Sequence, residues 1–166
     1  MPLTPLHFGP STLIGLPLKR YLDLPVFVFA NVVIDLEPLA VIVFGLTYPQ
    51  HGYLHTFLIG GILGVVWGLI AYTFRVPIGK LMNLFKLDYS TTLRKMLFSA
   101  VLGVFFHVFL DSFLYSDVQP FYPFKNNPLL GIINESTMNI FCTVCFIPAF
   151  LIFVFMAYSY DKRHGR

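Results

Sequence analysis

Residues 96–115 read MLFSAVLGVFFHVFLDSFLY, an apolar stretch interrupted by one histidine, His107, and one carboxylate, Asp111. A helix needs about 20 largely apolar residues to cross the roughly 30 Å hydrocarbon core of a bilayer, and this stretch has that length. An ionisable side chain at such a depth costs on the order of 3 kcal/mol, so its presence indicates a functional role. The stretch therefore predicts a membrane-spanning helix with polar chemistry inside it.

Similar apolar segments recur along the chain, over residues 24–48, 53–74 and 138–160. Of the 166 residues, 57% are apolar and 11% are charged, whereas a soluble domain carries about 25% charged residues. So few charges cannot cover the surface of a soluble domain of this size, which argues against a soluble enzyme, a disordered chain and a nucleic-acid-binding module. We predict an all-α fold, a polytopic membrane helical bundle with four long transmembrane helices in a single domain over residues 1–166.

Three smaller features complete the predicted bundle. Residues 3–18 are apolar but short, which predicts a re-entrant or spanning N-terminal helix. Residues 76–95 interleave apolar and basic side chains, a pattern typical of an interfacial stretch against anionic lipid. Gly60, Gly64 and Gly68 form two GxxxG steps, which favour close helix packing in lipid.

The Lys and Arg residues predict the orientation in the membrane. If the segments before residue 24, between 74 and 96, and after 160 are cytoplasmic, every Lys and Arg except Lys125 lies inside. Cytoplasmic loops of membrane proteins carry such an excess. We therefore expect a protein integral to the cell membrane, with a cytoplasmic C-terminus and with residues 116–137 on the outer side. Membrane lipids are the expected partners, and the sequence leaves the oligomeric state open.

The ionisable side chains at or near membrane depth are of the kinds that bind metals, namely His7, Asp35, Glu37, His51, His55, His107 and Asp111. The pairs His51/His55 and His107/Asp111 are each four residues apart, a spacing that places two ligands on one helical face. Pro49 and Gly52 argue against a regular helix at His51, so the spacing argument is weaker for the first pair than for the second. A rise of 1.5 Å per residue puts several of these groups near midplane, with His55 higher, at about 28 Å. We predict a shared metal site towards the outer face.

Imidazole and carboxylate ligands favour Zn²⁺, with Mn²⁺, Fe²⁺ and Ni²⁺ as alternatives, and the surplus of ligands leaves one or two ions open. His7, His55, His107 and Asp111 are the first choices as ligands, and Asp35 would bridge or ligate. Glu37 is the candidate general base, although a ligand role stays open. Core packing is the favoured role for Cys142 and Cys145, which form a single CxxC.

Four segments together resemble a known family: TPLHFGP, NVVIDLEP, HGYLHT and FHVFLDS. The chain is similar over most of its first 125 residues to the YdjM/YbcI-type family of membrane-bound metal-dependent hydrolases. The matching positions are His7, Asp35, His51, His55, His107 and Asp111, and Glu37 stands where the family often has a second acidic residue. Related sequences often have Arg where this chain has Gly52. A more distant similarity to zinc-dependent phospholipase C would imply phosphoester chemistry.

The resemblance and the residues together favour an integral-membrane hydrolase that uses metal-activated water. Its substrate would be amphiphilic: a phospholipid, a lipid-linked phosphate, or another lipid with an ester or amide bond. Two alternatives remain open from the sequence. The same residues could form the transport site of a metal-ion transporter or permease subunit, or a buried hydrogen-bond network in a structural membrane protein.

Overall fold

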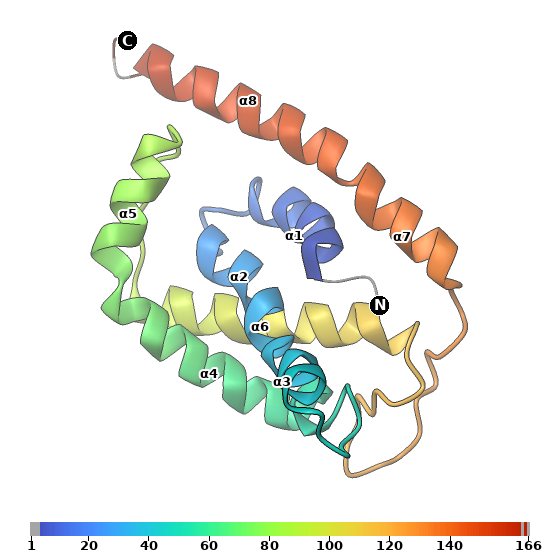
Figure 1. Ribbon diagram of the computed structural model, residues 1–166. Helices are drawn as coiled ribbons and strands as arrows, with labels where there is room; N and C mark the ends of the chain where they lie inside the picture. The colour runs from blue at the N-terminus through green and yellow to red at the C-terminus, as the bar shows by residue number, and fades with distance from the viewer. Residues whose placement is uncertain (1–3, 164, 166) are drawn as a thin grey trace.

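The computed structural model describes residues 4–163 and 165, and every regular element in that part of the chain is a helix (Figure 1). Two are short 3-10 helices, η1 and η2, which end at His7 and His55, and the rest are α-helices. In chain order they are η1 (Thr4–His7), α1 (Phe8–Gly15), α2 (Leu24–Ile34), α3 (Leu36–Phe44), η2 (Tyr53–His55), α4 (Phe57–Thr73), α5 (Arg75–Leu84), α6 (Leu93–Ser112), α7 (Glu135–Val144) and α8 (Phe146–Arg163).

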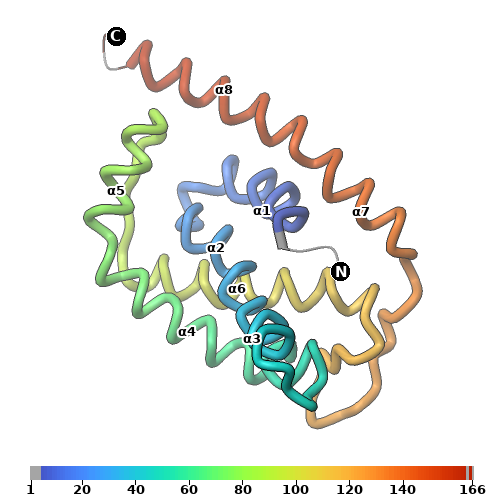
Figure 2. The backbone as a smooth tube through the Cα atoms, in the orientation of Figure 1, coloured from blue at the N-terminus to red at the C-terminus, as the bar shows by residue number. Residues whose placement is uncertain are grey.

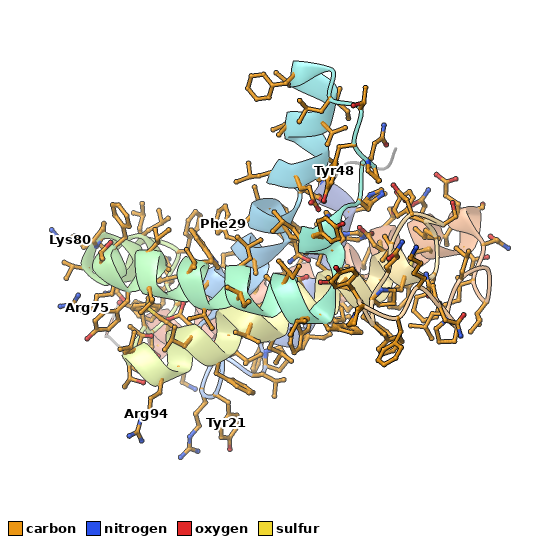
Figure 3. The ribbon with its side chains drawn as sticks, turned by 90° about the horizontal axis from the view of Figure 1, so that it is seen from below. Tyr21, Phe29, Tyr48, Arg75, Lys80 and Arg94 are labelled. Carbon is orange, nitrogen blue, oxygen red and sulfur yellow. The ribbon has the colours of Figure 1, made fainter. Side chains whose placement is uncertain are left out.

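Helix α6 forms the centre of the molecule, with α4 packed along one side and α2 crossing it (Figures 1 and 3). Glycines permit both contacts. A Cβ added at Gly64 would lie 2.8 Å from the Cα of Val101, and one at Gly103 would lie 2.5 Å from the carbonyl oxygen of Phe27. The GxxxG steps of α4 therefore do what the sequence predicted, because they bring two backbones together.

Proline sets the three breaks in the long apolar segments. A proline inside a helix cannot donate to the carbonyl four residues earlier, so the helix tends to end there. Helix α2 ends at Ile34, four residues before Pro38; α4 ends at Thr73, four before Pro77; and α7 ends at Val144, four before Pro148. Helical hydrogen bonding resumes at the residue after each proline. The amides of Leu39, Ile78 and Ala149 donate to the carbonyls of Asp35, Phe74 and Cys145, respectively.

These breaks change the number of spans. Within the described residues, three helical segments are long and apolar enough to cross a membrane: Leu24–Phe44, Leu93–Ser112 and Glu135–Arg163. The predicted span over residues 53–74 is wrong as a single long helix. The helix there is Phe57–Thr73, and it is long enough to cross a membrane only if it is counted together with α5, from which it is bent by 76°. The structure thus has three or four candidate spans rather than four long ones.

The remaining segments surround this centre. Helices α7 and α8 form one long arm at the edge of the molecule, with α1 between the arm and α6 (Figure 2). The predicted N-terminal helix over residues 3–18 is shorter than expected, since η1 and α1 end at Gly15 and residue 3 lies outside the described part. The arm begins at Asn134, whose side chain accepts a hydrogen bond from the Thr137 amide, as a helix cap does.

Candidate metal centre

Four of the predicted side chains meet at the centre of the molecule. Asp35 comes from the junction of α2 and α3, His55 from η2, and His107 and Asp111 from α6. One ligand atom of each lies within 4.8 Å of the others. His55, His107 and Asp111 are almost completely buried, while the side chain of Asp35 is 20% exposed. The structure thus brings together residues separated by up to 76 positions in the sequence.

Local structure explains how each side chain reaches this group. The break caused by Pro38 leaves Asp35 at the junction of α2 and α3, in the N-cap position of α3, where its side chain makes no capping hydrogen bond. Residues 53–55 form a single 3-10 turn that ends at His55, and Thr56 then caps α4 by accepting a hydrogen bond from the Ile59 amide. His107 and Asp111 lie on one face of α6, as their spacing predicted, with 3.0 Å between Nε2 and Oδ2.

The two central imidazoles are held from outside by their Nδ1 atoms. His55 Nδ1 donates to Glu37 Oε2 at 2.8 Å, and His107 Nδ1 lies 3.3 Å from His7 Nδ1. The Nε2 atoms of His55 and His107 are buried and have no partner with hydrogen-bond geometry. Buried polar atoms are nearly always satisfied, and a metal ion could supply the partner for these two imidazole nitrogens, which face the same two carboxylates.

The distances between the inward-facing atoms fit one metal ion. Nε2 of His107 lies 3.2 Å from Asp35 Oδ1, and Nε2 of His55 lies 3.5 Å from Asp35 Oδ1 and 3.9 Å from Asp111 Oδ2. Ligands at about 2.0–2.1 Å from a tetrahedral ion are roughly 3.3 Å apart. A set of two imidazoles and two carboxylates suits Zn²⁺, Mn²⁺, Fe²⁺ or Ni²⁺.

Glu37 orients the segment that carries His55. Besides His55 Nδ1, its carboxylate accepts hydrogen bonds from the backbone amides of Gly52 and Leu54, at 3.1 and 3.2 Å, and from the hydroxyl of Tyr48 at 3.3 Å. A carboxylate that holds the outer nitrogen of a ligating histidine is the usual support of a metal site. Glu37 therefore lies behind the group rather than within it.

Gly52 completes this support. Its position admits no side chain while Tyr48 keeps its place, because a Cβ there would lie 2.2 Å from the Tyr48 hydroxyl. That hydroxyl also accepts a hydrogen bond from the Tyr53 amide at 2.8 Å. The chain thus packs a tyrosine against the Glu37 carboxylate at this position.

His7 lies at the edge of the group. Its Nε2 is 3.6 Å from Asp111 Oδ1, and its ring meets that of His107 edge-on at 4.7 Å. Burial lowers the pKa of His7 to about 4, against the opposing effect of Asp111, so the ring is neutral at physiological pH. For His55, burial lowers the pKa, but the carboxylates of Asp35 and Glu37 outweigh it and raise the pKa overall.

His51 is placed elsewhere than the helical spacing suggested. It lies in a non-helical loop, and its Nδ1 and backbone amide each lie 3.0 Å from the carboxylate of Asp117. The ring stacks on Tyr115 at 4.2 Å and meets the His55 ring edge-on at 4.9 Å. His51 is therefore a neighbour of the group and not one of its four converging members. Asp117 and Tyr115 were not singled out from the sequence.

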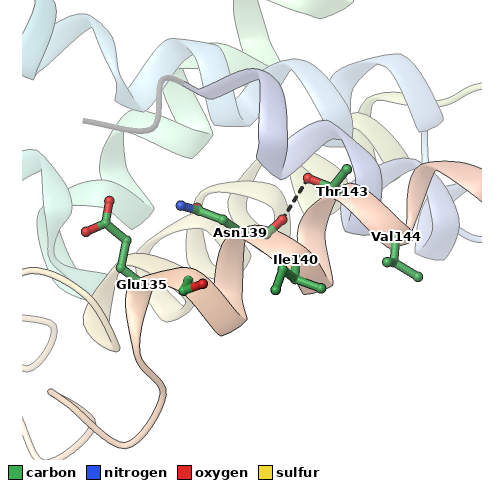
Figure 4. Close-up of a pocket in the computed structure, with 6 residues that line it drawn as sticks. Glu135, Asn139, Ile140, Thr143 and Val144 are labelled. Carbon is green, nitrogen blue, oxygen red and sulfur yellow. Dashed lines mark hydrogen bonds between the residues drawn. The ribbon is translucent and has the colours of Figure 1, made fainter.

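Three grooves open between the helices, and the four-residue group lines none of them. One of about 530 Å³ follows α7 along Glu135, Asn139 and Thr143 (Figure 4). Two apolar ones flank α1, a 450 Å³ groove bounded by α6 and α7 and a 500 Å³ groove bounded by α2, α5 and α8. The first apolar groove includes Leu110 and Phe113, which bracket Asp111 on α6. Cys142 and Cys145 are buried nearby and form no disulfide.

No family model matches the chain, and neither a curated protein nor a solved structure is significantly similar to it. The fold and the geometry of the group therefore carry the functional argument, and the resemblance to the YdjM/YbcI-type family stays a prediction.

Proposed function

We propose that the protein is an integral-membrane, metal-dependent hydrolase that acts on an amphiphilic substrate. One observation carries the proposal. His55 and His107 are buried and engaged through Nδ1 on the outside, while their Nε2 atoms face two carboxylates at 3.0–3.9 Å on the inside without hydrogen-bond geometry. A purely structural network would instead satisfy these nitrogens, because an unmade buried hydrogen bond costs about 1–3 kcal/mol.

The chain's own residues divide into three roles. His55, His107 and Asp111 would hold the ion, which leaves it the open position that catalytic sites keep. Glu37 and His7 would orient the two imidazoles. Asp35 has the most exposed side chain of the four, at 20%, and would accept the proton of the attacking water. A bound divalent ion, with Zn²⁺ the first candidate, lowers the pKa of water and polarises the bond to be cleaved.

This assignment moves the role of general base from Glu37 to Asp35. Both oxygens of Glu37 already accept hydrogen bonds from residues 48–55. Protonation of Glu37 would disturb the support of His55, whereas Asp35 faces both inward-pointing imidazoles directly. Glu37 is therefore a positioning residue in the proposed mechanism.

The surroundings support an amphiphilic substrate. His107 and Asp111 lie on a helix that is long and apolar enough to cross a membrane, and an apolar groove of 450 Å³ between α1, α6 and α7 includes their neighbours Leu110 and Phe113. Lipid chains are the matching ligands for such walls. A phospholipid, a lipid-linked phosphate, or a lipid ester or amide would fit, and the family resemblance favours a phosphoester. We further propose that the basic loops and the C-terminus are cytoplasmic and that the centre faces the outer side.

Turnover by the reconstituted protein tests this proposal. Protein in liposomes, loaded with Zn²⁺ or Mn²⁺, would be offered phosphoester, carboxylic ester and amide lipids. We expect hydrolysis of one class, with Asp35→Asn reducing the rate by at least about 100-fold while the metal is retained. Metal flux across the liposome without hydrolysis of any class would overturn the proposal in favour of a transporter.

A further inference from the structure

The end of the molecule that carries α5 has exposed apolar and basic side chains together (Figure 3). Helix α5 turns by 76° from α4 and begins with Arg75. The apolar side chains of Val76, Leu81 and Leu84 on this helix are 59, 51 and 76% exposed. The same helix also carries the basic residue Lys80. Only Met82 is buried among its residues, so most of the helix surface faces away from the protein.

Part of the positive charge at this end has no carboxylate partner among the residues that the structure describes. Three carboxylates lie here, and each is engaged: Asp23 accepts from the hydroxyls of Tyr89 and Thr91, Asp88 pairs with Arg163, and Asp161 pairs with Lys86. In the described part of the chain, no carboxylate pairs with Arg75, Lys80 or Arg94.

Figure 3 shows the three cations at the same end of the molecule, well away from Tyr48 beside the metal centre. Arg75 lies over the ring of Tyr72 at 4.4 Å and donates to the Tyr72 carbonyl, which fixes its position beside the bend. Tyr21 projects at the same end of the molecule and is 66% exposed. Aromatic and basic side chains are together typical of the layer where hydrocarbon meets lipid headgroups.

We propose that this basic surface, formed by Arg75, Lys80 and Arg94 with the exposed apolar residues of α5, binds the phosphates of anionic phospholipids. Charge complementarity favours that ligand, because these three cations are exposed and form no ion pair with any carboxylate of the described residues. The apolar side chains between them select a membrane over a soluble acidic partner, since they would otherwise stay in water. Helix α5 then lies in the headgroup layer with its apolar residues against the acyl chains. The inference does not depend on hydrolase activity.

Native mass spectrometry of the full chain from mixed micelles tests this inference, with equal amounts of phosphatidylglycerol and phosphatidylcholine offered. We expect wild type to retain phosphatidylglycerol in about fivefold excess, as a few outward cations attract anionic lipid. The triple variant Arg75→Gln, Lys80→Gln, Arg94→Gln should bind both lipids about equally. Lys125→Gln removes the same kind of charge from the other end and should keep the wild-type preference.

A triple variant that keeps the preference, or a wild type that has none, would overturn the inference. All three positions are exposed, so folding should be unaffected. If the triple variant unfolds, the single variants Lys80→Gln and Arg94→Gln each should lower the excess part of the way, and unchanged excess in both would equally contradict the inference.

Discussion

Helix α6 and the α7–α8 arm both qualify as membrane spans, yet they use their apolar character differently. The arm is longer and more hydrophobic, with a mean hydropathy of 2.7 against 1.7 for α6, but 17% of its most apolar stretch is buried compared with 44% for α6. Ala149 is the one buried residue of α8, whereas ten residues of α6 are buried. The more hydrophobic helix is thus the peripheral one.

The difference in burial is explained by the lipid that surrounds the helices of a membrane protein. Lipid chains are as apolar as leucine, so a helix of large apolar side chains gains little by leaving lipid for the protein interior. The arm can stay at the edge with Phe155 69% exposed. Small and polar residues gain from burial, through close backbone contact at Gly103 and through the partners of His107 and Asp111. In this molecule, a lower hydropathy marks the helix that organises the site.

The largest effect should come from overfilling the contact of α6. Gly103→Val places a side chain 2.5 Å from the Phe27 carbonyl oxygen and 2.6 Å from Ala30 Cβ, where backbone must move. We expect a loss of about 3 kcal/mol in the free energy of unfolding, measured by denaturant titration in mixed micelles. The matched change on the arm, Ala157→Val, should cost less than about 1 kcal/mol. Equal losses would show that the two helices are equally central.

An intermediate effect is expected behind the metal centre. Glu37→Gln keeps the shape of the side chain but removes the charge that holds His55 Nδ1 and two backbone amides. Loss of such a supporting carboxylate typically lowers metal affinity by about 10–100-fold. Competition with a coloured chelator measures the affinity. Glu135→Gln on α7 serves as the control and should bind metal like wild type, and an unchanged affinity in Glu37→Gln would remove Glu37 from the support of the site.

The smallest effect should appear at His51. Asp117→Asn weakens its two contacts with that residue, but His51 contacts His55 only through the edge of its ring. We expect the metal affinity to stay within about threefold of wild type, the range of about 0.5 kcal/mol typical of peripheral substitutions. A loss as large as that of Glu37→Gln, in the same chelator assay, would instead make His51 a ligand.

The sequence predicted the all-helical class and the residues of the centre because polar groups are costly in lipid. The cost of unpaired backbone groups there favours helices, and ionisable side chains at that depth stand out as candidates for a site. His107 and Asp111 stood out in an apolar stretch, and their spacing fixed their common face. Asp35 and His55 were expected to join them, and the structure brings them there. The misfit in the expected height of His55 arose because α4 begins after it, so His55 lies in a separate turn.

Other features depend on contacts that a linear pattern does not contain. Asp117 lies in a polar segment where a carboxylate is unremarkable, and its partner His51 is 66 residues away. The support role of Glu37 depends on the turn over residues 52–55. The three helix breaks were nevertheless readable in principle, since Pro38, Pro77 and Pro148 each lie four residues after a helix end.

Metal content tests the central claim most directly. Wild type would be purified in mild detergent without chelator or histidine tag and analysed by elemental mass spectrometry beside His107→Ala, Asp111→Ala and the control Asp88→Ala. The account predicts about one transition-metal ion per chain in wild type and control, and loss of that ion from both α6 variants. A folded wild type that holds no metal and cannot be reloaded with zinc or manganese would contradict it.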